Sequence, residues 1–151
     1  MKVIILFFMV LSFSYSNTYT FLVNKYDKEV ELESKIIENI ATASLKEKVI
    51  LFIPEITENE RKIYKKLFRL GKTCEESNFI FVKKNIDKNV ICQDKRKLYF
   101  TNNYKKLLSN GDYFGAFFWS KSRPNIVFIK NRLHQNNISL PDSYSQFIED
   151  I

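Results

Sequence analysis

Two short, mostly apolar runs separated by one helix-forming segment constrain the fold more than any other feature of the sequence. The runs lie at residues 48–54 and 78–83, and runs of this length without polar alternation are typical of strands buried on both faces of a sheet. Between them, Thr57 and Glu60 have the spacing of a helix capping box, and Gly71 stands where the helical pattern stops. The order strand, helix, strand predicts a right-handed crossover and parallel pairing of the two strands.

An amphipathic helix is expected before the first strand, at residues 27–44. Apolar side chains recur in this segment at helical spacing, and charged residues stand between them. The apolar positions are Val30, Leu32, Ile36, Ile37 and Ile40, and the charged positions are Glu31, Glu33, Lys35 and Glu38. We therefore expect the apolar stripe to pack on a face of the sheet.

The second half of the chain predicts further strands and a hairpin. The expected elements are an edge strand at 90–92, a strand at 97–101, a helix at 104–109, hairpin arms at 113–119 and 125–129, and a last helix that begins at Pro141. A polar turn, residues 120–124, joins the two arms, and Gly115 in the first arm indicates a bulge or a close backbone approach. The predicted fold class is α/β: a single domain with a mixed sheet, a parallel strand-helix-strand start, a C-terminal antiparallel hairpin, and helices on the faces.

The first 16 residues have the composition of a signal peptide. Lys2 supplies a positive charge, residues 3–11 are apolar, and Ser14 and Ser16 form the small-x-small pattern that precedes a cleavage site. We expect cleavage after Ser16, which leaves residues 17–151 as one domain in the periplasm. An uncleaved membrane anchor is the alternative, although the apolar run is shorter than the about 20 residues that span a bilayer.

The two cysteines and the net charge bear on the environment of the protein. In an oxidising compartment Cys74 and Cys92 predict a disulfide, with two buried thiols as the alternative. The net charge is +7 at pH 7, and the basic residues are scattered along the chain. We interpret this charge as a solvated basic surface and expect no nucleic-acid partner.

The sequence contains no recognisable catalytic set, and we expect no metal and no cofactor. His134 is the single histidine and lies in a polar stretch. Zinc-type spacing of cysteine and histidine, Gly-rich phosphate loops and nucleophile elbows are all missing from the sequence. We therefore predict a protein that is not an enzyme. An enzyme of unrecognised type is the alternative, with His134 as its one obvious acid–base group.

The hairpin carries the first group of candidate binding residues. Trp119 is the only tryptophan and stands at the end of the first arm, beside a basic turn that contains Arg123. Tryptophan and arginine dominate the energetics of binding surfaces, so Trp119, Arg123 and Asn125 are candidates for a recognition site. A core role for Trp119, in which its ring closes the hairpin, is the alternative.

A second group of candidates follows strand ends. Arg132 lies after the second hairpin arm, and a contact with a buried carboxylate or with helix C-terminal carbonyls is its alternative role. Thr101 and Asn102 follow a predicted strand, at the edge where α/β sheets bind ligands. The alternative for the segment 101–103 is an ordinary helix N-cap.

The order and spacing of these elements resemble the YfiR-like family of small exported bacterial proteins over most of the chain, from about residue 32 to 148. The likeness rests on a helix that leads into the first strand, a cysteine before the third strand, and a Phe-Gly pair that opens a hairpin. The residues concerned are 36–41, 49–53, Cys92, 98–101, 114–115, 131–133 and 138–140. Glycine is scarcer than in the usual family pattern, and the turn with Arg123 and Pro124 is more basic.

This resemblance implies a non-enzymatic periplasmic domain. Characterised relatives bind the periplasmic part of a membrane diguanylate cyclase and hold it inactive, and disulfide state and envelope stress modulate that hold. Carried over to this chain, the resemblance implies that Cys74 and Cys92 are a redox-sensitive pair and that the hairpin region is one contact face.

We therefore expect an exported binding or regulatory protein that modulates a membrane-bound or periplasmic protein partner. A homodimer is also compatible with this class. The alternative is a small solute-binding protein or a transporter accessory, in which Thr101, Asn102 and Trp119 would face a pocket. The size of a single domain argues against a two-lobed binding cleft.

Overall fold

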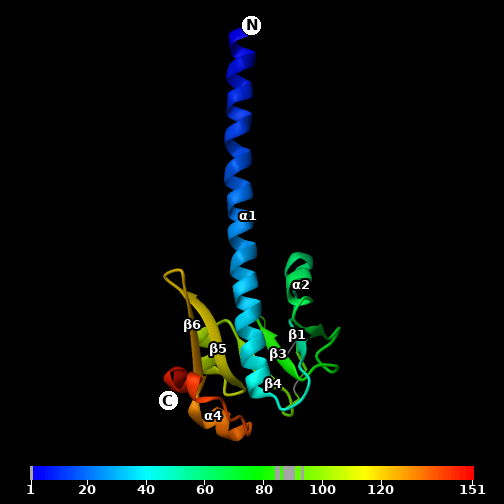
Figure 1. Ribbon diagram of the computed structural model, residues 1–151, viewed down its shortest axis with the longest axis vertical. Helices are drawn as coiled ribbons and strands as arrows, with labels where there is room; N and C mark the ends of the chain where they lie inside the picture. The colour runs from blue at the N-terminus through cyan, green and yellow to red at the C-terminus, as the bar shows by residue number, and fades with distance from the viewer. Residues whose placement is uncertain (1, 84–85, 87–90, 93) are drawn as a thin grey trace.

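The strands that the structure describes form one mixed sheet in the order β2-β1-β3-β4-β5-β6-β7 (Figure 1). This computed structural model describes residues 2–83, 86, 91–92 and 94–151, with side chains from residue 22 onward. The strands are β1 (Ile50–Phe52), β2 (Arg69–Leu70), β3 (Phe79–Val82), β4 (Leu98–Thr101), β5 (Tyr113–Ser120), β6 (Arg123–Ile129) and β7 (Ile148–Glu149). Neighbouring strands are parallel except β5 and β6, which form an antiparallel hairpin. The predicted α/β fold class is therefore confirmed.

Helix α1 (Lys2–Ser44) is much longer than the helix predicted at residues 27–44. Its C-terminal half crosses one face of the sheet, while its N-terminal half projects beyond the other elements (Figure 1). The predicted signal peptide lies outside the residues with described side chains, so cleavage after Ser16 stays a prediction. Among the described residues, no helix has both the length and the apolar character needed to cross a lipid bilayer.

Aromatic side chains fill the core between α1 and the sheet. Val30, Ile37, Ile40 and Ala41 of α1 are buried in this layer. The sheet contributes Phe79, Phe81, Phe100, Phe114, Phe117 and Phe128. The opposite face of the sheet packs Ile80, Val82, Tyr99, Ala116 and Val127 against Leu107 of α3 (Tyr104–Ser109). Both faces are thus covered, as the continuous apolar runs of the central strands predict.

The helix predicted at residues 57–71 is shorter in the structure. The Thr57–Glu60 capping box is present, but α2 (Glu58–Tyr64) ends early and the chain then extends into β2. Gly71 directly follows β2, and its N–H donates to the carbonyl of Leu51 in β1 at 2.9 Å. A Cβ atom at this position would overlap the Ser77 hydroxyl. The glycine therefore permits a close approach of two segments and does not end a helix.

The hairpin has a tighter turn than the predicted segment 120–124. Ser120 pairs with Arg123, so only Lys121 and Ser122 form the turn. Their φ angles are 49° and 61°, as in the two-residue turns whose twist matches the twist of paired strands. Gly115 also behaves as expected, because the register shifts where β4 meets this part of β5, and a Cβ there would lie 2.7 Å from the Phe100 ring.

The remaining segments differ from the predicted elements at three points. Of the edge strand predicted at 90–92, Val90 lies outside the described residues, and Ile91 and Cys92 are in no strand. The tail forms an unpredicted helix, α4 (Lys130–Gln135). In place of the last helix, a 3-10 helix (Asp142–Phe147) leads into β7, because Ile148 pairs with Phe128 at the sheet edge.

Candidate functional site

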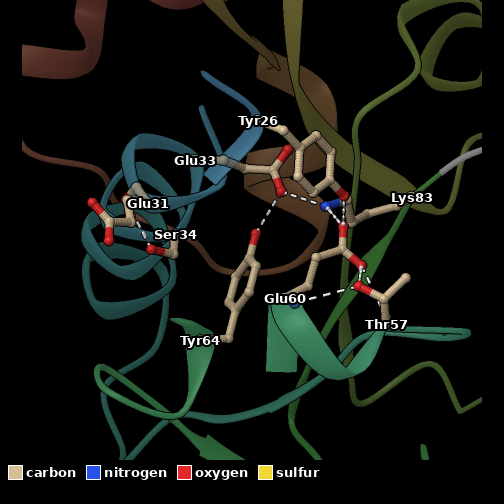
Figure 2. Close-up of polar contacts among 8 residues, drawn as sticks. All are labelled: Tyr26, Glu31, Glu33, Ser34, Thr57, Glu60, Tyr64 and Lys83. Atoms are coloured by element: carbon tan, nitrogen blue, oxygen red, sulfur yellow. Dashed lines mark hydrogen bonds and ion pairs between the residues drawn. The ribbon is translucent and has the colours of Figure 1, made fainter. Parts of the chain in front are cut away.

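A buried group of charged side chains fastens α1 to the rest of the domain. Lys83, directly after β3, lies between Glu33 of α1 and Glu60 of α2 (Figure 2). The Lys83 Nζ donates to Glu33 Oε1 at 2.6 Å and to Glu60 Oε1 at 2.7 Å. All three side chains are almost completely withdrawn from solvent. One cation thus joins a helix, a second helix and the central sheet.

Hydroxyl and amide donors complete this group, which we call the Lys83 cluster. Figure 2 shows the Tyr64 hydroxyl directed at Glu33, to which it donates at 2.7 Å. The Tyr26 hydroxyl donates to Glu60 at 3.0 Å, and the backbone N–H and hydroxyl of Thr57 donate to the other Glu60 oxygen. Two carboxylates face one ammonium, so these donors stabilise the second buried negative charge.

The pKa values in the cluster favour its charged form. Burial alone would raise the pKa of Glu60, but hydrogen bonds from Lys83 and Thr57 lower it to about 2. Burial would lower the pKa of Lys83, and the charge and hydrogen bonds of Glu33 and Glu60 raise it instead. Burial and the Glu33 charge raise the pKa of Tyr64, which keeps its proton. The donors and acceptors of the cluster satisfy one another, which suits it to position α1.

The Lys83 cluster was not predicted from the sequence. Glu33 was expected among the charged residues outside the apolar stripe of α1, and Leu32 within the stripe. The structure reverses these two positions: Glu33 is buried, and Leu32 is 42% exposed. At 3.6 residues per turn, Glu33 lies on the same face as Val30 and Ile37, whereas Leu32 is turned roughly 200° from Val30. The helical spacing from Val30 to Ile37 is the signal that could have placed Glu33 inside.

A groove opens between α1 and the end of the hairpin, and we call it the α1–hairpin groove. It has a volume of about 430 Å³ and is lined by Asn24, Lys25, Lys28, Glu29, Leu32 and Trp119. The Trp119 ring packs edge-on against Phe117, with centroids 5.7 Å apart, and keeps 36% of its surface exposed. The Trp119 ring therefore packs against the core on one side and leaves part of its surface exposed at the groove.

Two large exposed apolar side chains, Leu32 and Trp119, line this groove. The other large apolar side chains that the structure describes as exposed are Leu22, Val23, Tyr26, Leu108 and Ile151. Tyr26 faces α2, since its hydroxyl donates to Glu60. Exposed apolar groups scattered singly are ordinary, so Leu32 and Trp119, one on each wall, are the apolar feature of the groove.

The other hairpin candidates lie close to Trp119 in the strand pairing. Arg123 is exposed and pairs with Ser120, next to Trp119. The Asn125 amide donates to the Arg123 carbonyl at 2.9 Å, so this side chain shapes the start of β6. Arg123 and Asn125 do not line the groove, but Arg123 places a positive charge beside the hairpin turn.

Arg132 follows the opposite end of β6 and is engaged with the backbone. Its guanidinium donates to the carbonyls of Leu107, Asn110 and Tyr113 at 2.6, 3.0 and 2.8 Å. Two of these carbonyls belong to the C-terminal end of α3, which is one of the roles weighed from the sequence. Arg132 thus ties α4 to α3 and to β5.

Thr101 and Asn102 lie apart from the groove. Thr101 is buried, and its hydroxyl donates to the Val82 carbonyl at 2.9 Å and accepts from the Asn103 N–H. The Asn102 N–H donates to the same carbonyl of Val82 at 3.3 Å. Asn103 caps α3 by accepting from the Lys106 N–H. The structure therefore does not bring Thr101 and Asn102 together with Trp119.

Cys74 and Cys92 form a disulfide, as predicted, with their Cα atoms 5.8 Å apart. The bond joins the segment before β3 to the segment before β4. Cys74 is buried in the core layer on the face of the sheet opposite α1. The disulfide fits an oxidising compartment. Among the described residues, no group of acidic, histidine or cysteine side chains is arranged to hold a metal ion.

Comparison with known proteins supports the fold but gives no function. No model of a protein family matches the chain, and no curated protein matches its sequence. The crystal structure of a conserved domain protein from Vibrio cholerae is similar, with a TM-score of 0.50 and 13% identity. The similarity covers 79% of this chain and 58% of that one, so this chain spans little more than half of its length. The resemblance to the YfiR-like family stays a prediction.

Proposed function

We propose that this chain is an exported, non-enzymatic binding protein that regulates a membrane-associated protein partner, which it contacts through the α1–hairpin groove. The observation that carries the proposal is a groove lined by two exposed apolar side chains from different elements, Leu32 of α1 and Trp119 of the hairpin. Tryptophan is enriched among the residues that dominate the energetics of protein interfaces. The partner would cover Leu32 and Trp119.

The proposed location rests on two supporting features. The Cys74–Cys92 disulfide is stable in an oxidising compartment, and the first 16 residues have the pattern of a cleaved leader. The resemblance to YfiR-like proteins suggests the periplasmic part of a diguanylate cyclase as the partner. The hairpin, which that resemblance nominates as a contact face, supplies Trp119 to the groove.

The Lys83 cluster prepares the groove for binding. It fixes α1 in register with β3 and α2, and the same helix forms the long wall of the groove. A surface held in shape before the partner arrives loses less conformational entropy on association. We therefore assign the cluster a positioning role.

Site-specific photo-crosslinking tests the proposal. A photoreactive amino acid replaces Leu32 in the groove or, as a control, Leu108 on α3, which has a similar exposed fraction. We expect the Leu32 protein, expressed in its native host, to capture one inner-membrane protein. That product should disappear when Trp119→Ala is added. Capture of the same proteins from both positions, or of none from Leu32, would contradict the proposal.

Binding of a small solute, or an accessory role in transport, is the second candidate function. The groove volume of about 430 Å³ falls in the range of small-molecule pockets. Thr101 and Asn102 do not contribute to it, which removes two of the residues that this alternative invoked. A thermal-shift screen of metabolites decides the matter: a stabilising ligand whose effect is lost in Trp119→Ala would favour solute binding.

A further inference from the structure

We propose that the α1–hairpin groove receives an acidic amphipathic helix of the partner. This inference rests on the proposed function and specifies the chemistry of its partner. It follows from the distribution of charge around the groove and from the shape of its walls.

The charges at the groove are predominantly positive. Lys25 and Lys28 line it, and the adjoining hairpin turn adds Lys121, all of them exposed. The one acidic residue in the lining, Glu29, lies 4.0 Å from Lys25 on the next turn of the helix. Lys28 and Lys121 are therefore left to attract a negatively charged partner.

The other acidic residues of the same stretch of α1, Asp27 and Glu31, point toward α2. Asp27 accepts a hydrogen bond from Asn59 of α2 at 2.6 Å. Glu31 lines a separate hollow against α2 and lies 4.0 Å from Lys66. The two sides of α1 thus differ in charge, and the positive side is the one with Trp119.

The shape of the wall that α1 forms favours a helix as the occupant. Leu22, Lys25, Glu29 and Leu32 follow one another at helical spacing, and the span from Leu22 to Leu32 is about 15 Å. A groove with one helical wall is filled by the side chains of a second helix at positions i, i+3 or i+4, and i+7. Trp119 is the lining residue that the hairpin contributes, and it would pack on an apolar anchor of that helix.

A second copy of this chain fits the groove less well. It would bring the same positive rim and a net charge of +7 against an already positive surface. Like charges brought together across an interface oppose association. Charge complementarity therefore selects an acidic partner over a homodimer at this site.

Trp119 gives a direct assay, because it is the only tryptophan in the chain. Its fluorescence is followed while purified protein is titrated with a stapled helical peptide of about 14 residues, with leucines at i, i+4 and i+7 and glutamates on its flanks. A matched peptide carries lysines in place of the glutamates. We expect the acidic peptide to bind at least about tenfold more tightly, and added salt to weaken it.

Charge reversal on the protein provides the second arm. The double variant Lys28→Glu with Lys121→Glu should lose the preference for the acidic peptide, whereas Lys62→Glu with Lys105→Glu, on exposed positions of α2 and α3, should keep it. All four positions are exposed, so both variants are expected to fold.

Three results would overturn the inference. They are equal affinity for the two peptides, no binding of either, and a concentration-dependent dimer that masks Trp119. The crosslink from Leu32 is independent of these readouts. A partner captured there, together with no preference for the acidic peptide, would mean that the groove binds a protein of different chemistry. Failure of the crosslink itself would instead refute the proposed function.

Discussion

Lys83, at the end of β3, donates a hydrogen bond of 2.6 Å to Glu33, which lies 50 residues earlier on α1. This contact, together with the one to Glu60, joins the two helices to the sheet through buried charges. Such a contact is costly when broken, because burial deprives the remaining charge of water. The position of α1, and with it the shape of the α1–hairpin groove, therefore depends on Lys83.

Removal of this cation should be strongly destabilising. Lys83→Met leaves Glu33 and Glu60 buried without their positive partner, so we expect the free energy of unfolding to fall by about 3–5 kcal/mol. Urea denaturation followed by circular dichroism measures the change. Lys105→Met, at an exposed position of α3, is the control and should change stability by less than about 0.5 kcal/mol. Similar losses in both variants would show that the Lys83 cluster is not a structural tie.

Stability should depend on pH through the same cluster. The pKa of Glu60 is lowered from 4.5 to about 2, so its contribution is complete above about pH 4.5 and is lost as the pH falls toward 2. The pKa of Lys83 is raised above 10.5, so its contribution is complete below that pH and is lost as the pH rises through the higher value. Unfolding measured across pH should show a plateau between these limits. In Glu60→Gln the free energy of unfolding should fall less steeply toward low pH, and an unchanged fall would contradict this account.

Loss of the Tyr64 hydroxyl alone, with the ring kept, should destabilise the protein. Tyr64→Phe keeps the buried aromatic packing but removes the donor to Glu33 at 2.7 Å, so we expect a loss of about 1–3 kcal/mol. Tyr144→Phe is the matched control, since Tyr144 is half-buried and packs on Phe128 through its ring. Thermal melting of the two variants tests the difference, and equal melting temperatures would count against a role for the hydroxyl.

Gly115 should tolerate no larger residue. In Gly115→Ala the new methyl group would meet the rings of Phe100 and Phe128 and the Val127 carbonyl at 2.7 to 2.8 Å, and overpacking of this kind costs about 1–3 kcal/mol. Gly111→Ala, where the same atom would have open space, is the control. Chemical denaturation of both variants should separate them, and an unaffected Gly115→Ala protein would mean that the bulge in β5 relaxes freely.

The disulfide and the leader can be checked in one measurement. Intact mass and N-terminal sequencing of the native protein, purified without reductant, should give a chain that begins at Asn17 and is lighter by two hydrogens than its reduced form. A native chain that still begins at Met1 would contradict cleavage.

Removal of the disulfide by Cys74→Ser should lower the free energy of unfolding by about 3 kcal/mol, because the disulfide closes a loop of 18 residues.

Local patterns in the sequence were enough for much of the fold. The Thr57–Glu60 capping box, helix α3 and the β5–β6 hairpin depend on residues within a few positions of one another, and all were predicted. The disulfide was predicted because the chain has two cysteines and the leader-like first 16 residues indicate an oxidising compartment. The role predicted for Gly71 was wrong. A glycine that ends a helix cannot be told from sequence apart from one that leaves room for a neighbouring side chain, here the Ser77 hydroxyl.

The candidate site was only partly visible. Trp119 stood out as the single tryptophan beside a basic turn, but the other wall of its groove, Lys28 and Leu32, lies about 90 positions away in the chain. Of the Lys83 cluster, helical spacing could indicate only that Glu33 shares the face of Val30 and Ile37. Sequence periodicity specifies which face of a helix is apolar, but whether a charge such as Glu33 is buried depends on a cation supplied by another element. Tertiary packing alone brings Lys83 between Glu33 and Glu60, since the cluster is stabilised by contacts between residues that are far apart in sequence.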